Sequence, residues 1–74
     1  EDMKTYTVKG VVLDLLPDGR TARVRHEEIP GYMEAMTMPI KVKNQEDLKG
    51  VTPSDIIQFR LCVTDLSAWM DQIQ

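Results

Sequence analysis

The chain has 74 residues, which is room for one domain, so an enzyme with a separate substrate domain is excluded. Hydrophobic residues make up 42% and charged residues 28% of the sequence, a composition typical of a folded chain. The net charge of −3 disfavours a nucleic-acid partner, and the single cysteine cannot form an internal disulfide. Since no apolar run approaches the roughly 20 residues of a membrane helix, we expect no membrane contact by this segment.

The first two strands are predicted around a tight turn. Residues 1–5 are expected to form a flexible N-terminal segment, and residues 6–15 a strand rich in β-branched side chains. Gly10, in the middle of this strand, predicts a bulge or a sharp coil of the strand. The run PDG at residues 17–19 favours a hairpin turn, because proline presets φ and glycine tolerates a positive φ. Residues 21–26 are therefore predicted to form a second, antiparallel strand.

The second strand places the one histidine of the chain on an apolar face. Side chains alternate along a strand, so Ala22, Val24 and His26 share one face. The following residues, 27–35, contain a proline and a glycine and show no period. They are predicted to form a loop, and loops of that length in small domains are often functional.

The third strand has the clearest alternation in the chain. Within residues 36–43, Met36 and Met38 share a face with two aliphatic side chains, whereas Pro39 lies on the polar face. Proline lacks an N–H donor, which predicts an edge strand or a point where the pairing of a barrel changes partner. Residues 44–50 begin with an asparagine N-cap and end in glycine, which predicts a short helical connector.

Two further strands are predicted near the C-terminus. Residues 56–64 alternate, and this parity puts Cys62 on the outward face, where we expect a spectator thiol. Residues 67–74, which carry Trp69, are predicted to form the fifth strand and at most a frayed end. The pattern predicts an all-β fold, a small five-stranded OB-like β-barrel, as a single domain over residues 6–74. An open SH3-like roll is the alternative that periodicity does not separate from it.

One histidine and two methionines are predicted to converge at one end of this barrel. Met36 and Met38 are two residues apart on a strand and point the same way, and His26 ends the preceding strand on its apolar face. If these strands pair, one imidazole nitrogen and two thioether sulfurs face the same space. Soft thioethers and imidazole suit Cu(I) and Ag(I), whereas Zn prefers thiolates, imidazoles and carboxylates. The pattern therefore indicates a site for one Cu(I) or Ag(I) ion.

The same residues also fit an ordinary core. Methionine fills irregular apolar gaps, so a Met-x-Met pair on an inner face is typical of core packing. A lone histidine at a strand end is commonly just hydrogen-bonded. The neighbouring acids Glu27, Glu28 and Glu34 are interpreted as solvated loop charges, not as ligands.

Longer motifs resemble a known family. The stretch HEEIPGYMEAMTMPI at 26–40, with GVV at 10–12 and FRLCVTDLSAW at 59–69, is similar to the CusF-like periplasmic copper/silver-binding domain. The sequence HEEIPGYMEAMTMP at 26–39 is close to that of copper-binding domains found beside, or fused to, Sco/SenC-like copper proteins. The resemblance implies an OB-like barrel, export from the cytoplasm, and one Cu(I) or Ag(I) ion held by the histidine and the two methionines named above.

The chain departs from the resembled family at one position. Better-known members carry a tryptophan three residues before the first of the two methionines, and its ring covers the metal. Met33 stands there in this sequence. Met33 is therefore a candidate fourth ligand, and Tyr32 or Trp69 are candidate aromatic covers. Trp69 also fits simple packing over the open end of a small barrel.

The leading hypothesis for function is a metal carrier and not an enzyme. No nucleophile and base can be paired around the single histidine. The expected role is a metallochaperone-type module in copper or silver transfer, efflux or copper-protein maturation. Its partner would donate or accept the ion, as an efflux component or a Sco-like copper protein does. The expected location is periplasmic or otherwise exported, with any signal or anchor outside this sequence. The alternatives are an oligonucleotide-binding barrel, which the acidic charge and few aromatics oppose, and a purely structural adaptor.

Overall fold

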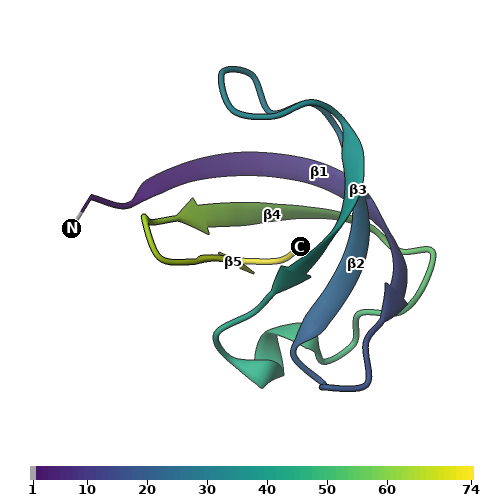
Figure 1. The fold of residues 1–74 in the computed structure, drawn as a ribbon. Helices are drawn as coiled ribbons and strands as arrows, with labels where there is room; N and C mark the ends of the chain where they lie inside the picture. The colour runs from purple at the N-terminus through teal and green to yellow at the C-terminus, as the bar shows by residue number, and fades with distance from the viewer. Residues whose placement is uncertain (1) are drawn as a thin grey trace.

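The computed structural model describes residues 2–74 and folds into one strongly bent antiparallel sheet (Figure 1). Its elements in chain order are β1 (Lys4–Leu15), β2 (Thr21–His26), β3 (Met36–Lys41), the 3-10 helix η1 (Gln45–Leu48), β4 (Ile56–Val63) and β5 (Ala68–Asp71). The strands lie side by side in the order β3-β2-β1-β4-β5.

Strand β1 organises this sheet because it has a different partner along each part of its length. Residues 4–11 pair with β4, and residues 10–15 pair with β2. A long twisted strand that is shared in this way bends the sheet back on itself. The two edges approach each other where Val42, just after β3, forms a bridge with Met70 of β5. The predicted all-β, five-stranded OB-like barrel is therefore confirmed.

The inner face of the barrel carries the hydrophobic core. Alternation along each strand directs every second side chain inward, and these positions hold mainly aliphatic and aromatic residues. Fully burying one such side chain stabilises the fold by roughly 1.5–3 kcal/mol. The largest fully buried apolar side chains are Phe59, Leu61, Met70, Val12 and Val24.

The predicted connector and edge strand are both present. The Asn44 side chain accepts a hydrogen bond of 3.0 Å from the Glu46 N–H, and η1 is a single 3-10 turn. Strand β3 lies at one edge of the sheet, and its Pro39 stands opposite Arg23 of β2. The edge position expected from the missing proline N–H is therefore confirmed.

The bulge that was one expectation for Gly10 lies elsewhere in β1. The irregularity in β1 lies between Val12 and Asp14, not at Gly10. Gly10 stands opposite His26, and a Cβ atom there would come within 2.7 Å of Val24 Cγ1. The missing side chain lets β1 and β2 approach closely at the rung that carries the histidine.

The N-terminal strand begins earlier than expected. Lys4 and Thr5 pair with Val63 and Cys62 of β4, so these two residues already belong to the sheet. Of the expected flexible segment, Glu1 lies outside the described residues.

The C-terminal segment is ordered by a return to the sheet. Strand β5 ends at Asp71, short of the expected end. The last residue, Gln74, then exchanges two backbone hydrogen bonds of 2.8 and 3.1 Å with Gln58 of β4. The expected frayed end is therefore not observed.

Candidate metal site

His26 is buried at the end of β2, with one ring nitrogen engaged. Its side chain is only 3% exposed, and Nδ1 donates a hydrogen bond of 2.7 Å to the Glu27 carbonyl oxygen. Because a carbonyl oxygen only accepts, this bond requires the proton of the neutral imidazole on Nδ1. Nε2 then carries the lone pair, and this buried atom has no hydrogen-bond partner among residues 2–74.

The strand register brings the two methionines to the same face as this nitrogen. Met36 stands directly opposite His26 in the β2–β3 ladder, and Met38 stands opposite Val24. Directly opposed side chains in an antiparallel pair have Cβ atoms about 4.5–5.5 Å apart on one face of the sheet. Met38 is half-buried, whereas Met36 is 44% exposed. The register therefore puts one histidine and two methionines on the same face of neighbouring strands, with Met36 the most exposed of the three.

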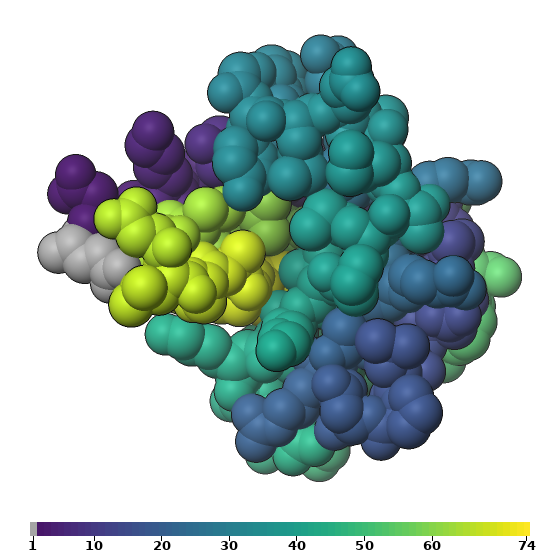
Figure 2. Space-filling model, in the orientation of Figure 1, coloured from purple at the N-terminus to yellow at the C-terminus, as the bar shows by residue number. Residues whose placement is uncertain are grey.

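The loop at 27–35 joins the histidine to the first of these methionines and folds back on itself. Ile29 is buried, and its backbone exchanges hydrogen bonds of 2.8 and 3.0 Å with Met33. The Met33 side chain is half-buried and packs against the hydrophobic core. Figures 1 and 2 show this loop and the start of β3 together at one end of the molecule.

The two aromatic candidates for a cover lie in different places. The Tyr32 ring, at the tip of the loop, stacks on Tyr6 of β1 with 4.9 Å between centroids and 10° between planes. Trp69 of β5 lies beyond the other end of β3, where the Lys43 Nζ sits 4.0 Å from its ring centroid. Tyr32 thus lies in the loop that follows His26, whereas Trp69 lies near the opposite end of β3.

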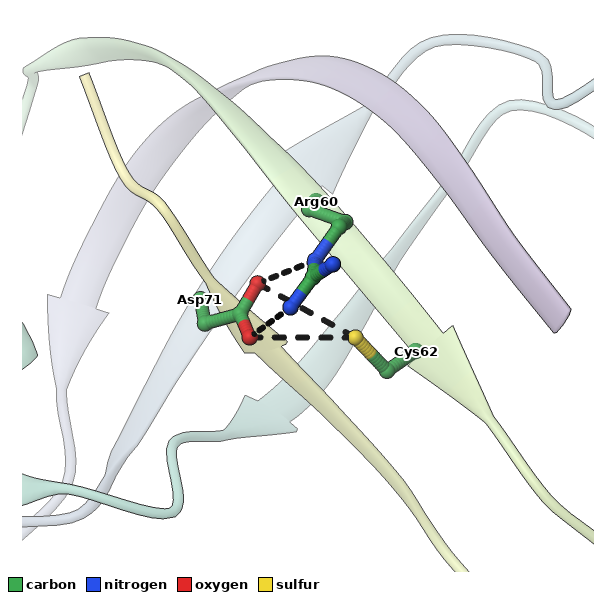
Figure 3. Close-up of polar contacts among 3 residues, drawn as sticks. All are labelled: Arg60, Cys62 and Asp71. Carbon is green, nitrogen blue, oxygen red and sulfur yellow. Dashed lines mark hydrogen bonds and ion pairs between the residues drawn. The ribbon is translucent and has the colours of Figure 1, made fainter. Parts of the chain in front are cut away.

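A second polar cluster, which sequence analysis missed, lies on the outer face of β4 and β5 (Figure 3). Arg60 forms a two-pronged ion pair with Asp71, with Nε and Nη2 at 2.7 and 2.6 Å from its carboxylate oxygens. The Cys62 thiol points at the same carboxylate, 3.9 Å from each oxygen. No local pattern announces this cluster, because it depends on the register between two strands.

Cys62 is a correction to the sequence analysis. It does lie on the outer side of β4 by parity, but it is fully buried, beside Trp69 and Thr5 of the neighbouring strands. Burial first, and then the Asp71 charge, raise the pKa of the Cys62 thiol. The hydrogen bonds from Arg60 lower the pKa of Asp71, and the same pairing raises the pKa of Arg60.

The comparisons with known proteins point to one family. The model of a family described as the copper-binding periplasmic protein CusF matches residues 5–74. The chain belongs to the CusF family. This CusF-family chain matches no curated protein sequence, so the family model and the solved structures carry the comparison.

Two solved structures share the fold. Metal-free CusF from Escherichia coli, residues 6–88, has a TM-score of 0.83 and 16% identity, covering 99% of this chain and 88% of the other. The C-terminal domain of SilB from Cupriavidus metallidurans has a TM-score of 0.80 and 19% identity, covering 96% and 87%. Both structures share their fold with this CusF-family chain over nearly its whole length. Within residues 2–74, no helix is long and apolar enough to cross a membrane.

Proposed function

We propose that this chain carries one Cu(I) or Ag(I) ion, held by His26, Met36 and Met38, and passes it to another protein in the periplasm. The observation that carries the proposal is the buried, unpartnered Nε2 of His26 on the face that Met36 and Met38 share. A buried polar atom without a partner is destabilising, so it calls for a ligand. A metal ion supplies that partner.

The donor set favours soft monovalent ions. Two thioethers and one imidazole are neutral donors, and a monovalent ion needs less compensation by negative ligands than a divalent one. Soft sulfur donors also prefer Cu(I) and Ag(I). The Glu27 carbonyl supports this use of His26, since a hydrogen bond donated by the other ring nitrogen orients a metal-binding imidazole and raises its basicity.

The unequal exposure of the donors suits a carrier. Nε2 of His26 is buried, whereas Met36 lies at the sheet edge with 44% of its surface exposed. An incoming donor from another protein reaches the ion from the Met36 side and replaces the ligands stepwise. We expect this exchange, and no catalysed reaction, to be the work of the site.

Met33 and Tyr32 are proposed as accessory residues of the same site. Met33 lies in the loop between His26 and Met36 and is half-buried, so its thioether is an optional fourth donor. Tyr32 is the aromatic residue nearest in the chain to these donors, although its ring is stacked on Tyr6. Trp69, with Lys43 over its ring, is left out of the proposed cover.

Native mass spectrometry tests the proposal. The domain is offered Cu(I), Ag(I), Zn(II) or no metal, together with His26→Ala and the surface control Leu66→Ala, at a residue 88% exposed in the turn between β4 and β5. We expect one-to-one adducts with Cu(I) and Ag(I) in the wild type and in Leu66→Ala, and a weakened adduct in His26→Ala. Equal binding of Zn(II), or equal Cu(I) binding by His26→Ala, would contradict the proposed site.

A further inference from the structure

The loop at 27–35 connects two proposed ligands that form the last rung of a hairpin. His26 is the final residue of β2, Met36 is the first residue of β3, and the two stand directly opposite each other. Terminal rungs of a ladder open first, and a longer connecting loop favours opening because closing it costs more entropy. The geometry of these two donors therefore depends on what restrains the loop.

Inside the loop, the restraints are local. Ile29 and Met33 exchange two backbone hydrogen bonds, and the Tyr32 N–H donates a third, of 2.9 Å, to the Ile29 carbonyl. These bonds make a small turn around Gly31, whose φ of +77° suits glycine. They shape the loop tip, while the buried Ile29 side chain and the Glu27 N–H, which donates a hydrogen bond of 2.9 Å to the Lys9 carbonyl oxygen, hold the start of the loop to the barrel.

The stack of Tyr32 on Tyr6 adds a tie between the loop tip and β1, a strand outside the hairpin. Tyr6 lies in β1 opposite Leu61 of β4, is half-buried, and packs against the hydrophobic core. Tyr32 is 40% exposed, so its ring lies between this support and solvent. The near-parallel rings, 4.9 Å apart, are in the favourable range for offset stacking. Tyr6, a side chain of the sheet, thus restrains Tyr32, a side chain of the loop.

We propose that Tyr6 is a positioning residue for the metal site. By stacking on Tyr32 it holds the loop at 27–35 against β1, keeps the rung between His26 and Met36 closed, and so slows release of the bound ion. This inference rests on the function proposed above. Tyr6 acts through Tyr32 and the loop.

A first experiment needs no metal. Amide hydrogen exchange is followed by NMR in the metal-free wild type, Tyr6→Leu and Tyr6→Phe. In Tyr6→Leu we expect faster exchange at Tyr32 and Met33 with unchanged exchange in the core of β4, whereas Tyr6→Phe keeps the ring and stays near the wild type. Unchanged exchange at Tyr32 and Met33 in Tyr6→Leu would overturn the inference.

A second experiment measures ion release. Stopped-flow transfer of Cu(I) to a chromogenic chelator is followed for the wild type, Tyr6→Leu, Tyr32→Leu, the double variant, Tyr6→Phe and the control Leu66→Ala. If the two rings act only through their stack on each other, each single leucine variant releases the ion roughly two- to tenfold faster, the factor expected from a typical aromatic pair. The double variant is then no faster than either single variant. Tyr6→Phe restores slow release.

The outcomes separate the two proposals. If the wild type binds no Cu(I) or Ag(I), the proposed function fails, while hydrogen exchange still decides whether Tyr6 restrains the loop. If the wild type binds the ion and Tyr6→Leu releases it at the wild-type rate, Tyr6 is not a positioning residue and the proposed function stands. If the rate increases of the two single variants multiply in the double variant, the two rings act independently, and the inference is also overturned. If Tyr6→Leu fails to fold, Tyr32→Leu at the exposed loop tip removes the same stack, and unchanged release by this variant overturns the inference.

Discussion

At position 26 a single backbone carbonyl decides which imidazole nitrogen is free. The Glu27 oxygen accepts the hydrogen bond from Nδ1, so the lone pair of the neutral ring belongs to Nε2. That atom is buried on the face that Met36 and Met38 share. The chemistry of the candidate site thus begins with a nitrogen that is buried and has no hydrogen-bond partner within residues 2–74.

The tautomer of His26 is directly measurable. In long-range ¹H–¹⁵N NMR spectra of the metal-free domain at neutral pH, we expect Nδ1 to be the protonated nitrogen and Nε2 the unprotonated one. Ag(I) should shift the Nε2 resonance strongly and the Nδ1 resonance weakly, because the ion binds the lone pair of Nε2 and leaves the hydrogen bond from Nδ1 to Glu27 in place. A protonated Nε2 in the metal-free protein would contradict the assignment of this atom as a ligand.

The two methionines should separate binding from folding. Leucine conserves the volume of methionine, so Met36→Leu and Met38→Leu should each change the free energy of unfolding by less than about 1.5 kcal/mol. The smaller change is expected at Met36, which is 44% exposed. Each variant should bind Cu(I) and Ag(I) more weakly, as measured by competition with a chelator. Wild-type affinity in both variants would mean that these side chains serve only the core.

Met33 decides whether the proposed site has three or four ligands. Its half-buried thioether either binds the ion or only packs against the core. X-ray absorption at the copper edge should count one sulfur fewer in Met33→Leu than in the Cu(I)-loaded wild type. An equal sulfur count in the two proteins would return Met33 to a purely packing role.

At the scale of elements, the pair β4 and β5 is held by charge as well as by its ladder. The two-pronged bond between Arg60 and Asp71 spans the outer face of these strands, beside the buried thiol of Cys62 (Figure 3). Both charged side chains keep partial access to solvent, which limits the stabilisation that this pair adds. Strand β5 is the shortest strand, so this pair matters most for it.

Acid should weaken that pair. The pKa of Asp71 is lowered in the folded chain, chiefly by the hydrogen bonds from Arg60. The resulting stabilisation is present above the pKa of an unfolded aspartate, about 3.9, and is lost as pH falls through the lower folded value. Asp71→Asn should therefore lower the free energy of unfolding at pH 7, measured by urea denaturation. Between pH 7 and pH values below 4, the free energy of unfolding should fall less in Asp71→Asn than in the wild type. Parallel pH profiles for the two proteins would refute this role.

For the whole molecule, ion binding and folding are coupled. The proposed donors lie on two strands and come together only in the folded barrel, so an ion bound there stabilises the native state. At free Ag(I) about 100-fold above the dissociation constant, the gain is about 2.7 kcal/mol, which corresponds to a rise in Tm of roughly 10–20 °C for a domain of this size. Differential scanning calorimetry measures it. The rise should shrink in His26→Ala and stay in Leu66→Ala, and an equal rise in His26→Ala would place the ion elsewhere.

The strands could be predicted well, and the site only in part. The alternation within residues 36–43 and the PDG turn depend on neighbouring residues, so the predicted strands come close to their observed bounds, and β3 ends two residues earlier than predicted. The burial of Cys62 could not be predicted, because parity tells the side of a strand and not what covers it. The same limit applies to the Gly10 contact, which depends on how closely two strands pass.

The sequence by itself determined that Met36 and Met38 share a face and that His26 lies on an apolar one, because successive side chains of any strand point to opposite sides. Only the tertiary structure decided that His26 faces Met36, that Tyr32 rests on Tyr6, and that Trp69 lies under Lys43 instead of at the site. These contacts depend on strand register and on the bend of the sheet. Both arise from packing between segments far apart in the chain, for which no local pattern of residues provides a signal.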